Sequence, residues 1–310
     1  AEDGIRDRDV TGVQTCALRS ETVHKFQQKD LPGCLADFKS LLNVLLVLQD
    51  YVVKSKIRLA PHKVYIDTFI TKFALHCFSL IYNLNGIKIQ CKEIGLDAKI
   101  FDLPSLHILV RAQLETLRMA EFIYFLPTSE SELEFRYKNW IYAGLLRRRD
   151  IYNVGGSVMP QPCEDTADSD KKALEELKQY LIETPFFKKY TTNQQKEIIN
   201  KGKERLFNSW ESLMSQANIN RKISSSLYTL TSSSAHSTGL ALILLRKSKL
   251  GFNEKSRTAN LIVYLSTMIL ATFIMELKKN LKAVEIKYNT LSVDVTDRIE
   301  IYAGMLAKKK

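Results

Sequence analysis

An uninterrupted apolar segment, residues 261–275, is the feature that most constrains how this chain can fold. It holds 15 residues and is bounded by Asn260 and Glu276. A helix that crosses a bilayer needs about 20 apolar residues, so we expect no insertion into a membrane. A helix that is apolar on all sides is typical of the centre of a helical protein. The segment therefore predicts a buried helix around which other helices pack.

Apolar residues recur at helical spacing along most of the remaining chain. With 12 Gly and 7 Pro in 310 residues, the chain has few of the breakers that a many-stranded protein needs. We therefore predict an all-α protein, a multi-helix bundle with eight or nine helices. The predicted helices span residues 36–57, 63–84, 105–126, 130–152, 170–182, 191–217, 220–248 and 254–288, and residues 191–217 can form one helix or two. A loop is predicted after residue 84, through Gly95, and a short strand or a final helix over the last twenty residues.

Residues 153–169 are the best candidate for a boundary within the chain. They include NVGGS, PQP and EDTADSD, which are typical of a loop or linker. We expect them to separate an N-terminal helical half, residues 21–152, from a C-terminal half, residues 170–310, that packs on it. Residues 1–20 stand apart, because AEDGIRD and VTGVQTCAL resemble the translation of a sequencing-library adapter. We expect this segment to be an artefact with no place in the fold.

The chain is strongly basic, with a formal net charge of +11 at pH 7. Residues 186–222 carry eight Lys and Arg against three acids, and residues 246–310 carry thirteen against six. A basic surface indicates a polyanionic partner, either nucleic acid or an anionic membrane. A Lys-rich composition can also serve only to keep the surface soluble, and this alternative stays open.

Metal and disulfide chemistry find little support in the sequence. Cys34, Cys77, Cys91 and Cys163 are far apart and form no CxxC pair, so reduced thiols in the cytoplasm are the simplest interpretation. None of the five His residues has a second His at metal-ligand spacing, and we predict neither a metal nor a cofactor. P-loop, GxGxxG, HExxH and GxSxG motifs do not occur.

Two short polar patterns are the candidates for a site. Arg111 and Glu115 lie four residues apart and share a face of one predicted helix. Ser232 and His236 share a face of another, within a run of serines that a mid-helix position disfavours unless packing or function requires it. If the two helices meet, Arg111 can hold a phosphate, Glu115 can orient His236, and the imidazole can transfer a proton. The alternative is a buried hydrogen-bond network that only fixes the helix packing.

Three segments carry a resemblance to known proteins: RAQLETLRMAEFIYFL, RYKNWIYAGLLRRRDIY and YTLTSSSAH. Over residues 36–280 the chain resembles a bacterial all-helical family of unknown function. That family has Arg-x3-Glu on one helix, an aromatic and Arg-containing helix after it, and Ser-x3-His near the end. The resemblance places Arg111 and Glu115 in the first motif, Trp140 and Arg147 in the second, and Ser232 and His236 in the third.

A more distant likeness is to the HEPN domains, many of which are metal-independent ribonucleases of defence systems. Their signature places Arg four to six residues before His on one helix, whereas only Ser, Thr, Leu and Ala separate His236 from Tyr228. Cleavage would therefore need Arg111 to supply the cation from another helix. Further contacts with phosphate or nucleic acid are predicted at Arg118, Arg147, Arg148 and Arg149.

We therefore predict a cytoplasmic protein that engages RNA or a nucleotide, with metal-independent, RNase-like and defence-related cleavage as the finer form of this hypothesis. The alternative is a non-catalytic protein-interaction module whose polar cluster is structural. A homo-oligomer is left open, and association with a membrane through residues 258–276 is a third interpretation.

Overall fold

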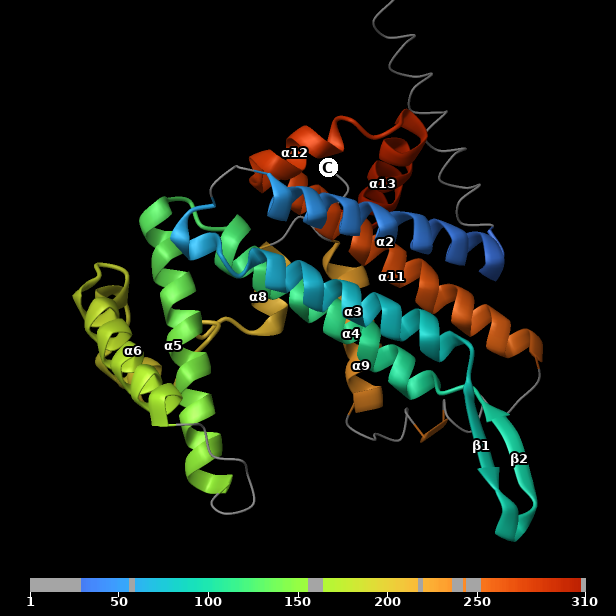
Figure 1. Ribbon diagram of the computed structural model, residues 1–310, viewed down its shortest axis with the longest axis horizontal. Coiled ribbons are helices and arrows are strands. Elements are labelled where there is room, and N and C mark those ends of the chain that lie inside the picture. The colour runs from blue at the N-terminus through green and yellow to red at the C-terminus, as the bar shows by residue number, and fades with distance from the viewer. Residues whose placement is uncertain are drawn as a thin grey trace, which may run out of the picture. The chain divides into compact units, whose positions relative to one another are not determined.

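The computed structural model describes residues 29–55, 59–155, 164–216, 220–235, 242–243 and 252–307. The segment that resembles an adapter and the imidazole of His236 lie outside them. Within the described residues the chain is helical apart from one β-hairpin (Figure 1). The prediction of an all-α bundle is confirmed. The described residues hold more helices than the eight or nine predicted. Leu281 is extended and splits the predicted helix 254–288, residues 202–209 divide the predicted segment 191–217 into two helices, and the chain end forms another.

The bounds of the elements follow the apolar periodicity closely in most of the chain. The helices are α2 (Leu31–Lys54), α3 (Ile66–Leu84), α4 (Leu103–Ala120), α5 (Glu130–Gly155), α6 (Glu164–Glu183), α7 (Thr192–Lys201), α8 (Trp210–Gln216), α9 (Arg221–Ala235), α11 (Phe252–Asn280), α12 (Lys282–Tyr288) and α13 (Val293–Leu306). The strands are β1 (Ile87–Cys91) and β2 (Leu96–Ile100). A 3-10 turn, η1 (Pro61–Lys63), precedes α3, and a π-helical turn, η3 (Glu121–Phe125), follows α4.

The chain forms two compact units, each drawn from distant parts of the sequence. Unit 1 comprises Ala1–Ser55, Ile70–Leu114 and Ile219–Lys310, and unit 2 comprises Lys56–Phe69 and Glu115–Asn218. Both units therefore take residues from before and after the stretch 153–169 that the sequence suggests as a boundary. Helix α6 begins inside that stretch, at Glu164.

Helix α11 is the central element of unit 1. Helices α2 and α13 both pack against it, and on α3 the ring of Phe73 lies 4.7 Å from that of Phe273, centroid to centroid. The apolar side chains of α11 that are fully buried are Val263, Ile269, Leu270, Ala271, Phe273, Ile274 and Leu277. Most of the apolar segment that the sequence singles out is thus inside unit 1.

Three of the described helical segments are long and apolar enough to cross a membrane, judged by length and composition alone. They are Leu31–Lys54, Pro61–Leu84 and Arg257–Asn280. The last is the best covered by other parts of the chain, and Pro61–Leu84 is the least covered.

A buried carboxylate joins α2 to α13. Asp37 is 4% exposed, and its Oδ2 accepts hydrogen bonds from Lys29 Nζ at 2.6 Å and from the Tyr302 hydroxyl at 2.7 Å. Arg298 Nη1 lies 3.3 Å from the other carboxylate oxygen. A buried carboxylate is tolerated when it is paired and hydrogen-bonded, so these contacts fix where α13 meets α2. Burial and the bond to Asp37 also raise the pKa of Tyr302, which keeps its hydroxyl protonated.

The stretch between α3 and α4 that is predicted as a loop is instead mostly a hairpin. Strands β1 and β2 are antiparallel, with Ile87 opposite Ile100 and Cys91 opposite Leu96. The turn ends at Gly95, whose φ of 62° lies in the left-handed region that glycine adopts without strain. The loop prediction was wrong because five residues that alternate between apolar and polar are a weak indication of a strand. The strand is stable only once the second strand pairs with it.

In unit 2, helix α5 packs against α6, and the end of α7 comes close to α5. Gly202 ends α7 with a φ of 62°, and a Cβ atom there would lie 3.0 Å from the Cα of Ala143 on α5. Only glycine permits both the backbone conformation and this close approach. The approach places the last turn of α7 beside the middle of α5.

The Asp37 cluster leads to a prediction about stability. Asp37→Ala removes the shared acceptor of Lys29, Arg298 and Tyr302, and we expect it to lower the free energy of unfolding by about 2–3 kcal/mol. Asp294→Ala is the matched control, because Asp294 is an exposed carboxylate that pairs with the same Arg298; we expect a loss below about 1 kcal/mol. Urea unfolding measures both. Equal losses in the two variants would show that Asp37 does not join the helices.

Candidate functional site

Helices α4 and α9 contact each other through polar side chains in unit 1. Arg111 on α4 donates from Nη1 to the Ser232 hydroxyl at 3.2 Å and from Nη2 to the Tyr228 hydroxyl at 3.3 Å. The guanidinium carbon also lies 5.0 Å from the centre of the Tyr228 ring, within the range of a cation–π interaction. The structure thus places Arg111 beside Ser232 and adds Tyr228, which lies one turn earlier on the same face of α9.

A second contact between these helices is one that sequence reasoning missed. His107 lies one turn before Arg111 on α4, is 4% exposed, and has its Nδ1 2.8 Å from the Ser234 hydroxyl. Burial lowers the pKa of His107 below its ordinary value of 6.5, so the ring is neutral at pH 7. The spacing of His107 and Arg111, four residues apart, was the available signal. Two members of the serine run therefore have partners on α4.

The cluster of Arg111, Tyr228 and Ser232 has the chemistry to hold an anion. Both hydroxyls accept a hydrogen bond from the half-buried guanidinium, and each keeps a proton that it can donate to a phosphate oxygen. Without a ligand, the guanidinium and the two hydroxyls also satisfy part of one another's hydrogen-bonding capacity, as the groups of a buried packing network must. The geometry of α4 and α9 is therefore compatible with an anion site and with a structural role.

The other predicted members of this cluster are placed differently. Glu115 is partly exposed and lies one turn after Arg111 on α4, while His236 lies outside the described residues. Arg118 is 1% exposed and forms an ion pair with Glu121, which shields its guanidinium from solvent.

The three consecutive arginines near the end of α5 are all ion-paired within unit 2. Their partners are Glu204 for Arg147, Asp170 for Arg148 and Asp150 for Arg149. The side chains of these arginines are about half exposed, and exposed ion pairs contribute little, so a phosphate can compete with the carboxylates.

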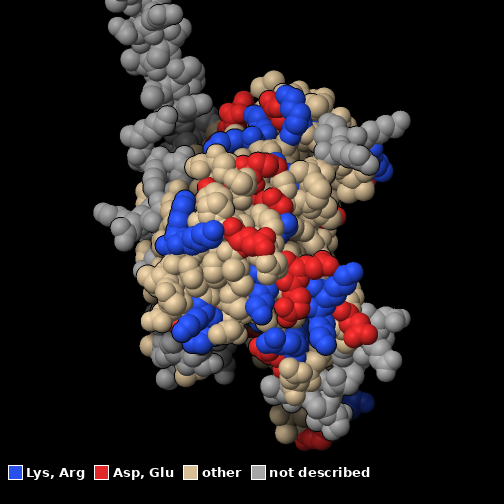
Figure 2. All heavy atoms as spheres, turned by 90° about the vertical axis from the view of Figure 1, so that its left-hand side faces the viewer, with Lys and Arg blue, Asp and Glu red and all other residues tan. Residues whose placement is uncertain are grey.

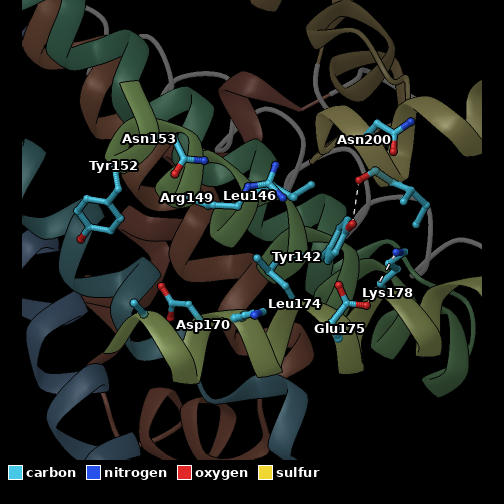
Figure 3. Close-up of a pocket in the computed structure, with 13 residues that line it drawn as sticks. Tyr142, Leu146, Arg149, Tyr152, Asn153, Asp170, Leu174, Glu175, Lys178 and Asn200 are labelled. Atoms are coloured by element: carbon cyan, nitrogen blue, oxygen red, sulfur yellow. Dashed lines mark hydrogen bonds and ion pairs between the residues drawn. The ribbon is translucent and has the colours of Figure 1, made fainter. Parts of the chain in front are cut away.

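A pocket of about 570 Å³ lies in unit 2 between α5, α6 and α7 (Figure 3). Its volume is within the range of small-molecule sites. Tyr142, Leu146 and Leu174 supply apolar surface, and the Tyr142 hydroxyl is already used, because it donates to the Ile199 carbonyl at 2.8 Å. Burial and the charge of Glu175 raise the pKa of Tyr142.

Cationic and amide groups line the same pocket. Arg149 comes from α5 and Lys171 and Lys178 from α6. Lys178 lies 3.8 Å from the Glu175 carboxylate, whereas Lys171 is ion-paired with none of the residues that the structure describes. The rest of the polar lining is Tyr152, the amides of Asn153 and Asn200, and the carboxylates of Asp170 and Glu175. Of these residues sequence reasoning had identified only Arg149, since the others become neighbours only when the three helices pack.

Charges of both signs share the molecular surface. On the face seen in Figure 2, Lys and Arg side chains lie side by side with Asp and Glu side chains. Among the residues that the structure describes, no group of three or more His, Cys, Asp or Glu side chains could hold a metal ion.

The buried His107 makes stability depend on pH. The pKa of His107 is lower in the folded chain than in the unfolded chain. The neutral ring therefore stabilises the fold fully above pH 6.5, and this stabilisation is lost as the pH falls through the pKa of the folded state. We expect the free energy of unfolding to fall as the pH is lowered from about 7.5 to about 5, and to fall less in His107→Gln. Urea unfolding at each pH measures this. His76→Gln is the comparison variant. Burial and the charge of Lys72 also lower the pKa of His76, so this histidine contributes to the same dependence of the unfolding free energy on pH. Identical slopes in the wild type and His107→Gln would contradict a buried, neutral His107.

Comparison with known proteins finds no matching family model, no similar curated protein and no similar solved structure.

Proposed function

We propose that this protein binds a phosphate-bearing ligand, a nucleotide or single-stranded RNA, in the pocket between α5, α6 and α7. One observation carries the proposal: a cavity of about 570 Å³ combines aromatic surface with three cations, two amides and two carboxylates, and both carboxylates are ion-paired, Asp170 with Arg148 and Glu175 with Lys178 (Figure 3). Aromatic rings and cations are the two groups that single-stranded nucleic acids require. The net charge of +11 supports the same class of ligand.

Each part of the pocket has a role in this proposal. Arg149 and Lys171 come from different helices and would contact phosphate oxygens, with the release of counterions. Tyr152 offers a ring on which a base can stack. The amides of Asn153 and Asn200 can donate to and accept from the edge of a base. The Asp170 carboxylate is paired with Arg148, which reduces its repulsion of a phosphate.

Metal-independent, RNase-like cleavage in a defence-related context is the finer form of the proposal, and it would use the cluster of α4 and α9 in unit 1 instead of the pocket of unit 2. Arg111 would stabilise the charge on the phosphate, and His236 would transfer a proton. Ser232 and Glu115 would position these two groups. The contacts of Arg111 with two hydroxyls support this assignment.

A second candidate function is a non-catalytic protein-interaction module, as a homo-oligomer or with another protein. The buried contact between His107 and Ser234 favours it, because this contact joins α4 to α9 and requires no ligand. Under this proposal Arg111 and Ser232 are part of the same helix packing.

The pocket is tested by a matched pair of neighbouring lysines. Lys171 lines the pocket, whereas Lys172 does not and points to solvent beside Glu176. We expect Lys171→Ala to weaken the binding of labelled oligouridine about fivefold at low salt and to reduce the salt slope by about one, and Lys172→Ala to have little effect. Fluorescence anisotropy at several salt concentrations measures both variants.

Two results would contradict the pocket proposal. One is an absence of binding to both oligouridine and ATP at low salt. The other is an equal loss of affinity in Lys171→Ala and Lys172→Ala, which would indicate diffuse attraction to the basic surface.

Cleavage is tested separately with labelled RNA in the presence of a chelator. We expect His236→Ala to lower the cleavage rate at least about 100-fold at an unchanged melting temperature, because it removes a proton-transfer group. His107→Ala is the comparison and should lower the melting temperature, because it leaves the buried Ser234 hydroxyl unpaired. A wild-type chain that binds no RNA and cleaves none would leave the interaction module as the better proposal.

A further inference from the structure

The β1–β2 hairpin in unit 1 has one apolar face. Side chains alternate between the faces of a strand, and directly opposed residues share a face. The register pairs Ile87 with Ile100, Ile89 with Ala98 and Cys91 with Leu96. These residues therefore lie on one face, and the polar and charged residues of both strands, Lys88, Gln90, Asp97 and Lys99, lie on the other.

This apolar face is accessible to solvent. Its four largest side chains, Ile87, Ile89, Leu96 and Ile100, are each between 37% and 42% exposed, and at the tip Ile94 is 73% exposed. Figure 1 shows the hairpin extending past the end of α3. An isolated two-stranded hairpin is marginally stable in water, and its apolar face needs something to cover it.

Helix α3, which leads directly into the hairpin, carries a second exposed apolar stripe. Leu75, Phe78 and Tyr82 follow one another at helical spacing, and all three are exposed. The segment Pro61–Leu84 is apolar enough to cross a membrane, yet it is the least covered of the three such segments. Exposed apolar surface therefore continues along the chain from α3 to the hairpin tip.

The charges around this surface indicate what covers it. Residues 70–100 contain four lysines, Lys72, Lys88, Lys92 and Lys99, against the two acids Glu93 and Asp97. Asp97 is partly neutralised, because its carboxylate lies 3.9 Å from Lys88 and accepts a hydrogen bond from Gln90. An apolar face backed by a polar face with lysines matches the acyl chains and anionic headgroups at the surface of a bilayer.

A second copy of this chain fits the same surface less well. Two copies packed through their apolar faces would leave the net positive charge of the opposite, polar faces uncompensated. An anionic bilayer covers the apolar face and also supplies the opposite charge.

We infer that the α3 stripe and the β1–β2 hairpin form a site for peripheral attachment to an anionic lipid bilayer. Ile94 and the apolar face of the hairpin enter the interfacial region, Lys92 in the turn lies at the level of the phosphates, and Lys88 and Lys99 on the opposite, polar face add to the attraction of the anionic headgroups, as in an amphipathic interfacial element. Glu93 lies beside Ile94 at the tip and is ionised, because bonds to Cys91 and to its own backbone amide lower its pKa. A charged tip keeps the hairpin at the interface, so attachment does not require any helix to cross the membrane.

The test compares two equally exposed apolar side chains in the full chain. Ile94 at the hairpin tip and Val293 at the start of α13 are both 73% exposed. We expect the protein to float with phosphatidylcholine vesicles that contain phosphatidylserine, and to bind pure phosphatidylcholine vesicles much less. Ile94→Ser should reduce the partition coefficient at least about tenfold, as expected for an isoleucine returned to water, whereas Val293→Ser should bind like the wild type.

A charge variant and a pocket variant complete the experiment. The double variant Lys92→Glu, Lys99→Glu should lose binding to the anionic vesicles, and Lys171→Ala should keep it, which separates this site from the pocket of unit 2. Circular dichroism confirms that each variant is folded. The proposal is overturned if the wild type does not float with anionic vesicles, or if Ile94→Ser and Val293→Ser bind equally. A concentration-dependent dimer that Ile94→Ser abolishes would assign the surface to a second copy instead.

Discussion

Burial of the apolar length of α11 is the constraint on which the rest of unit 1 depends. Moving a large apolar side chain such as Phe273 or Leu277 out of water contributes about 1.5–3 kcal/mol, and α11 buries many of them. No single neighbouring helix can cover such a surface. Helices α2 and α3 from the first part of the chain and α13 from its last part therefore all pack against α11. Directional contacts such as that of Asp37 with Tyr302 then select one arrangement among those that the apolar surface allows.

The polar chemistry of unit 1 is a consequence of this packing. Buried polar groups must be paired, and the helices around α11 pair them across their interfaces. Gln113 on α4 accepts a hydrogen bond from the buried Ser266 on α11, and His107 contacts Ser234 on α9. The same placement of α4 and α9 gives Arg111 its two hydroxyl partners, so an anion site and a structural network share one set of contacts.

The two proposed binding surfaces use different physical means. The pocket of unit 2 is concave and mixes cations with tyrosines, which suits a ligand that carries both phosphate and base. The hairpin surface of unit 1 is a protruding apolar face accompanied by lysines, which suits an extended anionic interface. The cations of both surfaces reflect the basic composition of the chain. The concave shape of the pocket and the protruding shape of the hairpin are what suit them to different ligands.

Local information in the sequence determined the all-α class and many helix ends. Apolar spacing is set by the helical repeat itself, and the start of α5 is marked by Ser129, whose hydroxyl accepts from the Glu132 amide as a cap should. Only the tertiary structure decided that Ser234 meets His107, that Lys171 joins Arg149 in a pocket, and that two short alternating segments pair as a hairpin. These outcomes depend on which faces meet after the core has formed, and local spacing contains no information about the partner.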